Sequence, residues 1–134
     1  RRLGLPAILH VRGAEARAAV RTLLAVEGVG AGAVIHYFVG DLAAARAWLA
    51  LGCHLSVGRP ATRPHETALR AALASDDVPL DRLLIETDTE PLPGRTTEPA
   101  DVVAVAEAIA TLKSLPLAEV AARTTATFAA LFGG

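Results

Sequence analysis

Four short apolar runs, each followed by a stretch of helical periodicity, constrain the fold of this 134-residue chain more than any other feature. Short apolar runs of this kind predict buried strands, and apolar residues spaced three and four apart predict amphipathic helices. Strands that alternate with helices lie parallel in one sheet and are joined by right-handed crossovers. The predicted strands are residues 5–10, 33–36, 53–57 and 83–87, and the predicted helices are residues 15–27, 41–52, 63–75, 98–113 and 117–132.

Two architectures fit four such units, an open doubly wound sheet and part of a (βα)8 barrel. An open dinucleotide-binding sheet usually has a glycine-rich loop after its first strand, whereas the first run here continues as His10-Val-Arg-Gly-Ala. Polar residues end several separate strands, which is typical of a barrel. We therefore predict an α/β fold of four parallel βα units plus an extra C-terminal helix, which is half of a TIM-like (βα)8 barrel.

Composition and charge narrow the possible functions. The length suits a single domain, and no linker divides residues 1–134. The net charge of -1 provides no overall basic field for nucleic acid or membrane, so any recognition of phosphate must be local. The single cysteine, Cys53, fits a reducing compartment, and no apolar run is long enough to span a membrane. We expect a soluble, cytoplasmic protein with no membrane partner.

Potential metal ligands end three of the four predicted strands. His10 and His36 close the first two runs, and Glu86 and Asp88 close the fourth. Imidazole nitrogens and carboxylate oxygens suit zinc and other divalent metals, which convert bound water into a nucleophile. The same residues also fit two other readings, in which the histidines pack or cap strand ends, or in which Glu86 or Asp88 is the general base of a metal-free enzyme.

The motifs at these strand ends, in their order and spacing, resemble the TatD family of metal-dependent deoxyribonucleases and related hydrolases. The resemblance covers nearly the whole chain. It rests on Leu5-Pro-Ala-Ile-Leu-His10-Val-Arg12-Gly-Ala14, Val34-Ile-His36-Tyr-Phe38-Val-Gly40, Leu83-Leu-Ile-Glu86-Thr87-Asp88, Glu98-Pro99 and Thr124-Thr-Ala-Thr-Phe-Ala-Ala-Leu-Phe132.

The resemblance implies a TIM-like barrel whose two divalent metal ions (zinc, magnesium or manganese) serve the hydrolysis of phosphodiester bonds in DNA or another phosphoester. It implies that His10 and His36 bind one ion, and that Asp88 binds the other and orients or deprotonates the attacking water. Glu86 shares a strand face with Asp88, so it is expected to support the ligands, to be a further ligand, or to form an ion pair at the barrel rim.

Two arginines are candidates for binding the substrate. Arg12 stands where the family has an arginine after the first of these histidines, and Arg95 lies in the loop before Glu98-Pro99. Either guanidinium has the geometry to hold a phosphate bidentately, but an ion pair in the barrel for Arg12 and a solvated surface position for Arg95 are equally simple readings. Ser56 stands where the family often has a serine, and its alternative is a small packing residue.

The sequence departs from the family in what it lacks. The family's His-x-His strand and the strand with the metal-bridging glutamate would both precede Arg1, so we expect the chain to be the C-terminal half of a barrel. A missing N-terminal half or a second copy would then complete the metal site, and the alternative function is a non-catalytic half-barrel. Glu90 adds a negative charge next to the expected phosphate site, which disfavours a polyanionic substrate.

Overall fold

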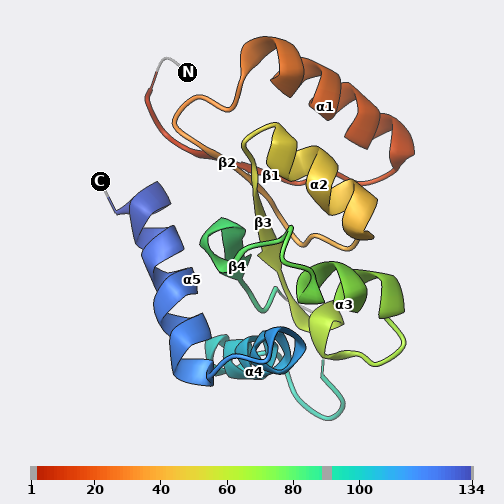
Figure 1. Ribbon diagram of the computed structural model, residues 1–134, viewed down its shortest axis with the longest axis vertical. Coiled ribbons are helices and arrows are strands. Elements are labelled where there is room, and N and C mark those ends of the chain that lie inside the picture. Colours follow the sequence, from red (N-terminus) through yellow and green to blue (C-terminus); the bar gives the residue numbers. More distant parts are fainter. Residues whose placement is uncertain (1–2, 89–91, 134) are drawn as a thin grey trace.

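The computed structural model describes residues 3–88 and 92–133, which are built around a parallel sheet (Figure 1). Within these residues the sheet has four strands in the order β1-β2-β3-β4, so the order in space follows the order in the chain. Every neighbouring pair is parallel. The α/β fold predicted from the sequence is confirmed. The strands are β1 (Ala7–Leu9), β2 (Ala33–Ile35), β3 (His54–Val57) and β4 (Leu83–Ile85).

Helices follow each strand, and an extra helix ends the chain, as the periodicity predicted. The last two pack against each other below the sheet in the view of Figure 1, with α5 running up beside it. The helices in the described residues are α1 (Ala14–Glu27), α2 (Leu42–Ala50), α3 (Thr67–Ala74), α4 (Val102–Lys113) and α5 (Leu117–Phe132).

Helix starts follow local chemistry. Asp41 caps α2, because its carboxylate accepts the backbone N–H of Ala44 at 2.8 Å. The predicted start of the third helix at residue 63 was wrong, and α3 begins only at Thr67. Arg63 precedes Pro64, whose ring disfavours helical backbone in the residue before it, and Arg63 accordingly has extended backbone (φ -89°, ψ 120°). The fourth helix is also shorter than predicted, since a 3-10 turn over Pro99–Asp101 leads into α4.

The core lies between the sheet and helices α2 to α5. Strand β3 is its centre, with Leu55 and Val57 fully buried. Trp48 from α2, Leu73 from α3 and Ile109 from α4 join the same apolar cluster. This cluster fixes the central strands, whose ends carry the polar residues described below.

The first strand and helix lie at the open side of the structure. Ile8 on β1 is 64% exposed, and α1 has no buried residue. The predicted apolar stripe of α1 is therefore largely uncovered, and Leu23 in it is 58% exposed. Since β1 and β4 are the two ends of the sheet, both have an unpaired edge.

The single cysteine and the lengths of the helices are the two features that bear on where the protein was expected to reside. Cys53 is a free, buried thiol, and burial raises its pKa to about 11. This makes it a poor nucleophile at neutral pH. In the part of the chain that the structure describes, no helix has the length and apolar character needed to cross a membrane. The cytoplasmic location stays a prediction.

Candidate metal centre

The register of the sheet brings the polar strand ends together at its carboxyl edge. Leu9 pairs with Ile35, and Ile35 pairs with Leu55, so the next residues, His10, His36 and Ser56, stand at one level. The parallel ladder continues beyond the strands, because the His36 backbone N–H donates to the Leu9 carbonyl at 3.0 Å. These are the strand ends at which barrel enzymes carry their active sites.

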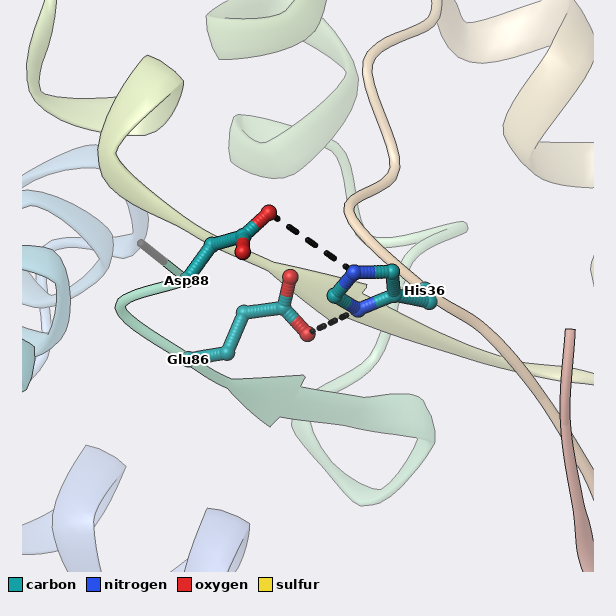
Figure 2. Close-up of side chains that lie close together, drawn as sticks. All are labelled: His36, Glu86 and Asp88. Carbon is teal, nitrogen blue, oxygen red and sulfur yellow. Dashed lines mark hydrogen bonds and ion pairs between the residues drawn. The ribbon is translucent and has the colours of Figure 1, made fainter. Parts of the chain in front are cut away.

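His36 lies between two carboxylates (Figure 2). Its Nδ1 is 3.0 Å from Oε2 of Glu86, and its Nε2 is 3.7 Å from Oδ2 of Asp88. A carboxylate oxygen can only accept a hydrogen bond, so Nδ1 carries the proton and donates a hydrogen bond to Glu86. In the neutral imidazole Nε2 then has a lone pair that faces Asp88.

The gap between His36 and Asp88 has the size that a divalent cation requires. Metal bonds of about 2.0–2.2 Å in tetrahedral geometry put neighbouring ligand atoms roughly 3.4 Å apart. The 3.7 Å between Nε2 and Oδ2 is close to this value. One ligand atom from each of His36, Glu86 and Asp88 lies within 4.8 Å of the others, and these three residues form a candidate metal cluster.

Glu86 has one satisfied oxygen and one unsatisfied oxygen. Its Oε2 accepts the Ser56 hydroxyl as well as Nδ1 of His36. Its Oε1 is buried and has no hydrogen-bond partner in the described structure. A buried acceptor without a partner is costly, and a cation or a water bound to that cation would remove this cost. The three residues therefore fit a divalent metal in both donor type and spacing.

Asp88 reaches the cluster through an unusual backbone conformation. It follows β4 with φ 54°, in the left-handed region that aspartate and asparagine tolerate better than most residues. Tyr37, which follows His36, has a similar φ of 51°. Non-glycine residues with left-handed backbone conformation are concentrated at functional sites, where the surrounding structure holds them in that conformation.

The predicted ligand His10 lies beside the cluster, and Glu86 takes its place within it. The His10 and His36 rings are 5.4 Å apart between centroids, and His10 is exposed directly after the edge strand β1. Of the three ligands predicted from the sequence, the structure thus brings His36 and Asp88 together, with Glu86 as their third member. The assignment of His10, His36 and Asp88 as ligands, and of Asp88 as the catalytic residue, stays a prediction.

The two predicted substrate-binding arginines have different surroundings. Arg12 is exposed, two residues beyond His10. Arg95 forms two hydrogen bonds with the Asp101 carboxylate at the start of α4, and this contact raises its pKa. Arg95 and Thr87 both line a cavity of about 210 Å³, and the Arg95 guanidinium there is paired with Asp101. Their binding of substrate stays a prediction, and Glu90 lies outside the described residues.

Ser56 is the residue whose role the sequence did not predict. It is 6% exposed, and its hydroxyl donates to Glu86. A small polar residue between the apolar residues Leu55 and Val57 was the available signal. That signal becomes informative only when the register places Ser56 level with His36.

The chain has parallel strands, and their carboxyl ends hold a histidine-carboxylate cluster. These features place it in the class of (βα) barrel proteins with a candidate metal centre. Within that class, the chain belongs to the TatD family, because the family described as TatD related DNase matches residues 1–133. The resemblance seen in the sequence motifs is thereby confirmed.

The relatives of the chain are longer proteins. It is 41% identical to the uncharacterized metal-dependent hydrolase YcfH of Escherichia coli K12, over 98% of this chain and 51% of that protein. It is 38% identical to the uncharacterized metal-dependent hydrolase YabD of Bacillus subtilis, over 97% of this chain and 52% of that protein. The chain therefore spans about half the length of the curated relatives it matches.

Solved structures agree on the fold. The crystal structure of YjjV, a TatD homologue from Escherichia coli K12, matches with a TM-score of 0.87 and 28% identity, over 99% of this chain and 52% of that one. A TatD-family hydrolase from Entamoeba histolytica matches with a TM-score of 0.78 over 98% of this chain and 52% of that one, and at 17% identity it supports the fold alone. The four βα units thus correspond to half of a TatD-type barrel.

Proposed function

We propose that the protein is a metal-dependent hydrolase of the TatD type that cleaves phosphodiester bonds, with DNA as the first substrate to test. One observation carries the proposal. The His36 ring has Nδ1 bonded to Glu86 and Nε2 facing Asp88 across 3.7 Å, which is the spacing of two ligands that share a divalent ion, whereas the resemblance implies a separate ion for each of them. The family and the names of the relatives support the same chemistry.

Each side chain of the cluster has a role in the proposed mechanism. His36 would hold the ion through Nε2 and Asp88 through Oδ2, while Glu86 holds the His36 ring in the required orientation. A bound divalent ion (zinc, magnesium or manganese, two ions in the complete protein) would supply a water of lowered pKa as the nucleophile. Asp88 would orient that water and accept its proton, and His10, which follows β1, would contribute a further nitrogen.

We further propose that Arg12 and Arg95 hold the phosphate of the substrate. Arg12 is exposed two residues beyond His10, so its guanidinium is accessible to a substrate from solvent. Arg95 lines the same cavity as Thr87. A phosphate entering that cavity would compete with Asp101 for the Arg95 guanidinium.

Completion of the barrel requires four more strands. We propose that an N-terminal half-barrel pairs with the open edges of β1 and β4, and a second copy of this chain is the alternative partner. The exposed apolar side chains on β1 and α1 support such a contact, as does the greater length of the relatives.

The substitution Asp88→Asn tests the proposed function in the protein expressed from its complete coding sequence. Asparagine tolerates left-handed backbone as aspartate does, so the change removes the charge and keeps the fold. We expect hydrolysis of DNA in the presence of zinc, magnesium or manganese to fall by about 100-fold or more, because a ligand contributes at least as much as its supporting residues. The measurement is the initial rate of DNA cleavage, with and without a chelator.

A matched control is Asp77→Asn, which removes the same charge from an exposed ion pair with Arg46. This variant is expected to keep the wild-type rate. Full metal-dependent activity in Asp88→Asn would refute the role of Asp88. Activity that a chelator leaves unchanged would instead favour a metal-free enzyme with Glu86 or Asp88 as general base.

A non-catalytic half-barrel is the second candidate function. The observation that favours it is the exposure of His10, which directly follows β1, the strand at one end of the described sheet. In this case the 134-residue chain provides part of a site and depends on a partner for catalysis. Hydrolysis of DNA by the purified chain alone would rule this function out.

A further inference from the structure

Two hydrogen-bond donors converge on one oxygen of Glu86. The Ser56 hydroxyl donates to Oε2, and Nδ1 of His36 donates to the same atom at 3.0 Å. Ser56 is 6% exposed, whereas the side chains of His36 and Glu86 are 25% and 18% exposed. The hydroxyl is thus the most buried member of a chain of contacts that runs from the interior of β3 toward solvent.

We propose that Ser56 is a positioning residue, whose hydroxyl holds the Glu86 carboxylate so that this carboxylate holds the His36 ring with Nε2 toward Asp88. The consequence for metal binding rests on the proposed function. The described contact of the Ser56 hydroxyl is with Glu86, so its effect on the metal ligands would pass through that carboxylate.

The geometry of the sheet explains why a serine on β3 can have this role. Ser56 pairs in register with Leu84, and Glu86 lies two residues further on the same face of β4. The backbone N–H of Glu86 donates to the Val57 carbonyl at 3.0 Å, which fixes the base of the Glu86 side chain next to β3. The hydroxyl then restrains the remaining rotations of a side chain that is otherwise long and flexible.

Loss of the hydroxyl would free both partners. A glutamate with one donor fewer has more accessible rotamers, and an imidazole held by a mobile carboxylate can turn about its side-chain bonds. Residues that support metal ligands in this way typically change metal affinity by about 10–100-fold when they are removed. A serine that served only to pack would behave differently, because alanine has nearly the same volume and would preserve the packing.

The test uses Ser56→Ala in the protein expressed from its complete coding sequence. We expect the dissociation constant for Zn²⁺, measured by titration calorimetry, to rise about 10–100-fold. In the metal-free protein we expect the His36 Nδ1–H proton resonance, visible in the wild type by NMR, to shift and broaden. The matched control is Thr124→Val, which removes a buried hydroxyl that bonds within its own helix to the Val120 carbonyl. It should leave both readouts unchanged.

A double-mutant cycle with Glu86→Ala, which removes the acceptor of the Ser56 hydroxyl, shows whether Ser56 acts through Glu86. If it does, the double variant binds Zn²⁺ no more weakly than Glu86→Ala alone. Losses in the two single variants that add together would overturn the proposal, and so would a Ser56→Ala protein with wild-type affinity and an unchanged Nδ1–H signal.

The two readouts separate this inference from the proposed function. If the wild-type protein binds Zn²⁺ and Ser56→Ala binds it equally well, the role of Ser56 is refuted and the hydrolase proposal stands. Wild-type protein that binds no divalent ion would refute the hydrolase proposal. The Nδ1–H resonance of the metal-free variants would then decide alone whether Ser56 positions Glu86 and His36.

Discussion

Gly58 lies where the loop after β3 passes the candidate metal centre, and its missing side chain leaves space for two neighbours. A Cβ atom at this position would be 3.1 Å from Cε2 of Tyr37 and 3.6 Å from Cγ of Glu86. The backbone of Gly58 (φ -112°) is open to any residue, so the constraint here is steric. The glycine allows the Tyr37 ring and the Glu86 side chain to approach the turn closely.

Gly58→Ala is therefore expected to lower the free energy of unfolding by about 1 kcal/mol. Overpacking costs about 1–3 kcal/mol, and the reduced entropy of the unfolded chain returns part of this cost. Chemical denaturation measures the difference. In a Tyr37→Asn background, which tolerates the left-handed backbone and removes the ring, the cost should disappear. An equal loss of stability in both backgrounds would show that the contact with Tyr37 is not the cause.

The start of α4 is organised by a small network of charged groups. The Asp101 carboxylate accepts the backbone N–H of Glu98 at 2.8 Å and two bonds from the Arg95 guanidinium. The bond from the Glu98 backbone is one half of a capping box, in which the Glu98 side chain in turn accepts the backbone N–H of Asp101. The bonds to Arg95, followed by the bond to Glu98, lower the pKa of Asp101 to about 2.

This network predicts a specific dependence on pH. Because the folded-state pKa of Asp101 lies below its ordinary value of 3.8, the contribution of this carboxylate to stability is present above pH 3.8 and is lost as the pH falls toward 2. Carbon-detected NMR titration should place the Asp101 midpoint near pH 2, and Arg95→Ala should move it back toward the ordinary value. A midpoint that does not move in Arg95→Ala would contradict the assignment of Arg95 as the main cause.

Periodicity predicted the elements well where local and tertiary preferences agree. The fifth helix was predicted with its observed bounds, Leu117–Phe132, and the second was predicted to begin at residue 41, where Asp41 caps α2. The start of α3 was missed because a proline can begin a helix or force extended backbone on the residue before it, and the second effect prevailed at Arg63. A pattern of residue types does not decide between these outcomes.

The site was partly predictable for a similar reason. His36 and Asp88 were identified as ligand types at strand ends, whereas the bond from His36 to Glu86 depends on side-chain rotamers that the sequence does not specify. The role of Ser56 depends on interstrand register, which links residues far apart in the chain. Strand ends can be located from local patterns, but contacts between strands cannot.

At the scale of the whole molecule, the open side of the sheet carries several of the most exposed apolar side chains. Leu3, Leu5 and Ile8, called here the β1 patch, are 81%, 68% and 64% exposed. The same region has the unpaired backbone groups of the edge strand β1. A strand that combines an apolar surface with a free edge is a site for association with another chain.

The 134-residue chain studied alone is therefore expected to self-associate, and Ile8→Lys should reduce this association. A lysine on an edge strand opposes pairing with another edge because its charge would have to be desolvated. Light scattering after size-exclusion chromatography gives the mass of each species at several concentrations. Ala43→Lys, which adds the same charge to an exposed position on α2, should leave the association unchanged. A wild-type chain that is monomeric at high concentration would contradict the prediction.

The strand order of the sheet has a consequence for biosynthesis. Because the order in space follows the order in the chain, each strand can pair with the one before it as it leaves the ribosome. The candidate metal cluster forms later than the first strand pairs, because Glu86 follows His36 by 50 positions in the chain. Until β4 and the residues after it are translated, His36 lacks its two carboxylate partners. A metal ion that bound earlier would therefore find an incomplete set of ligands. Translation of the last strand thus sets the earliest moment at which this centre can be loaded.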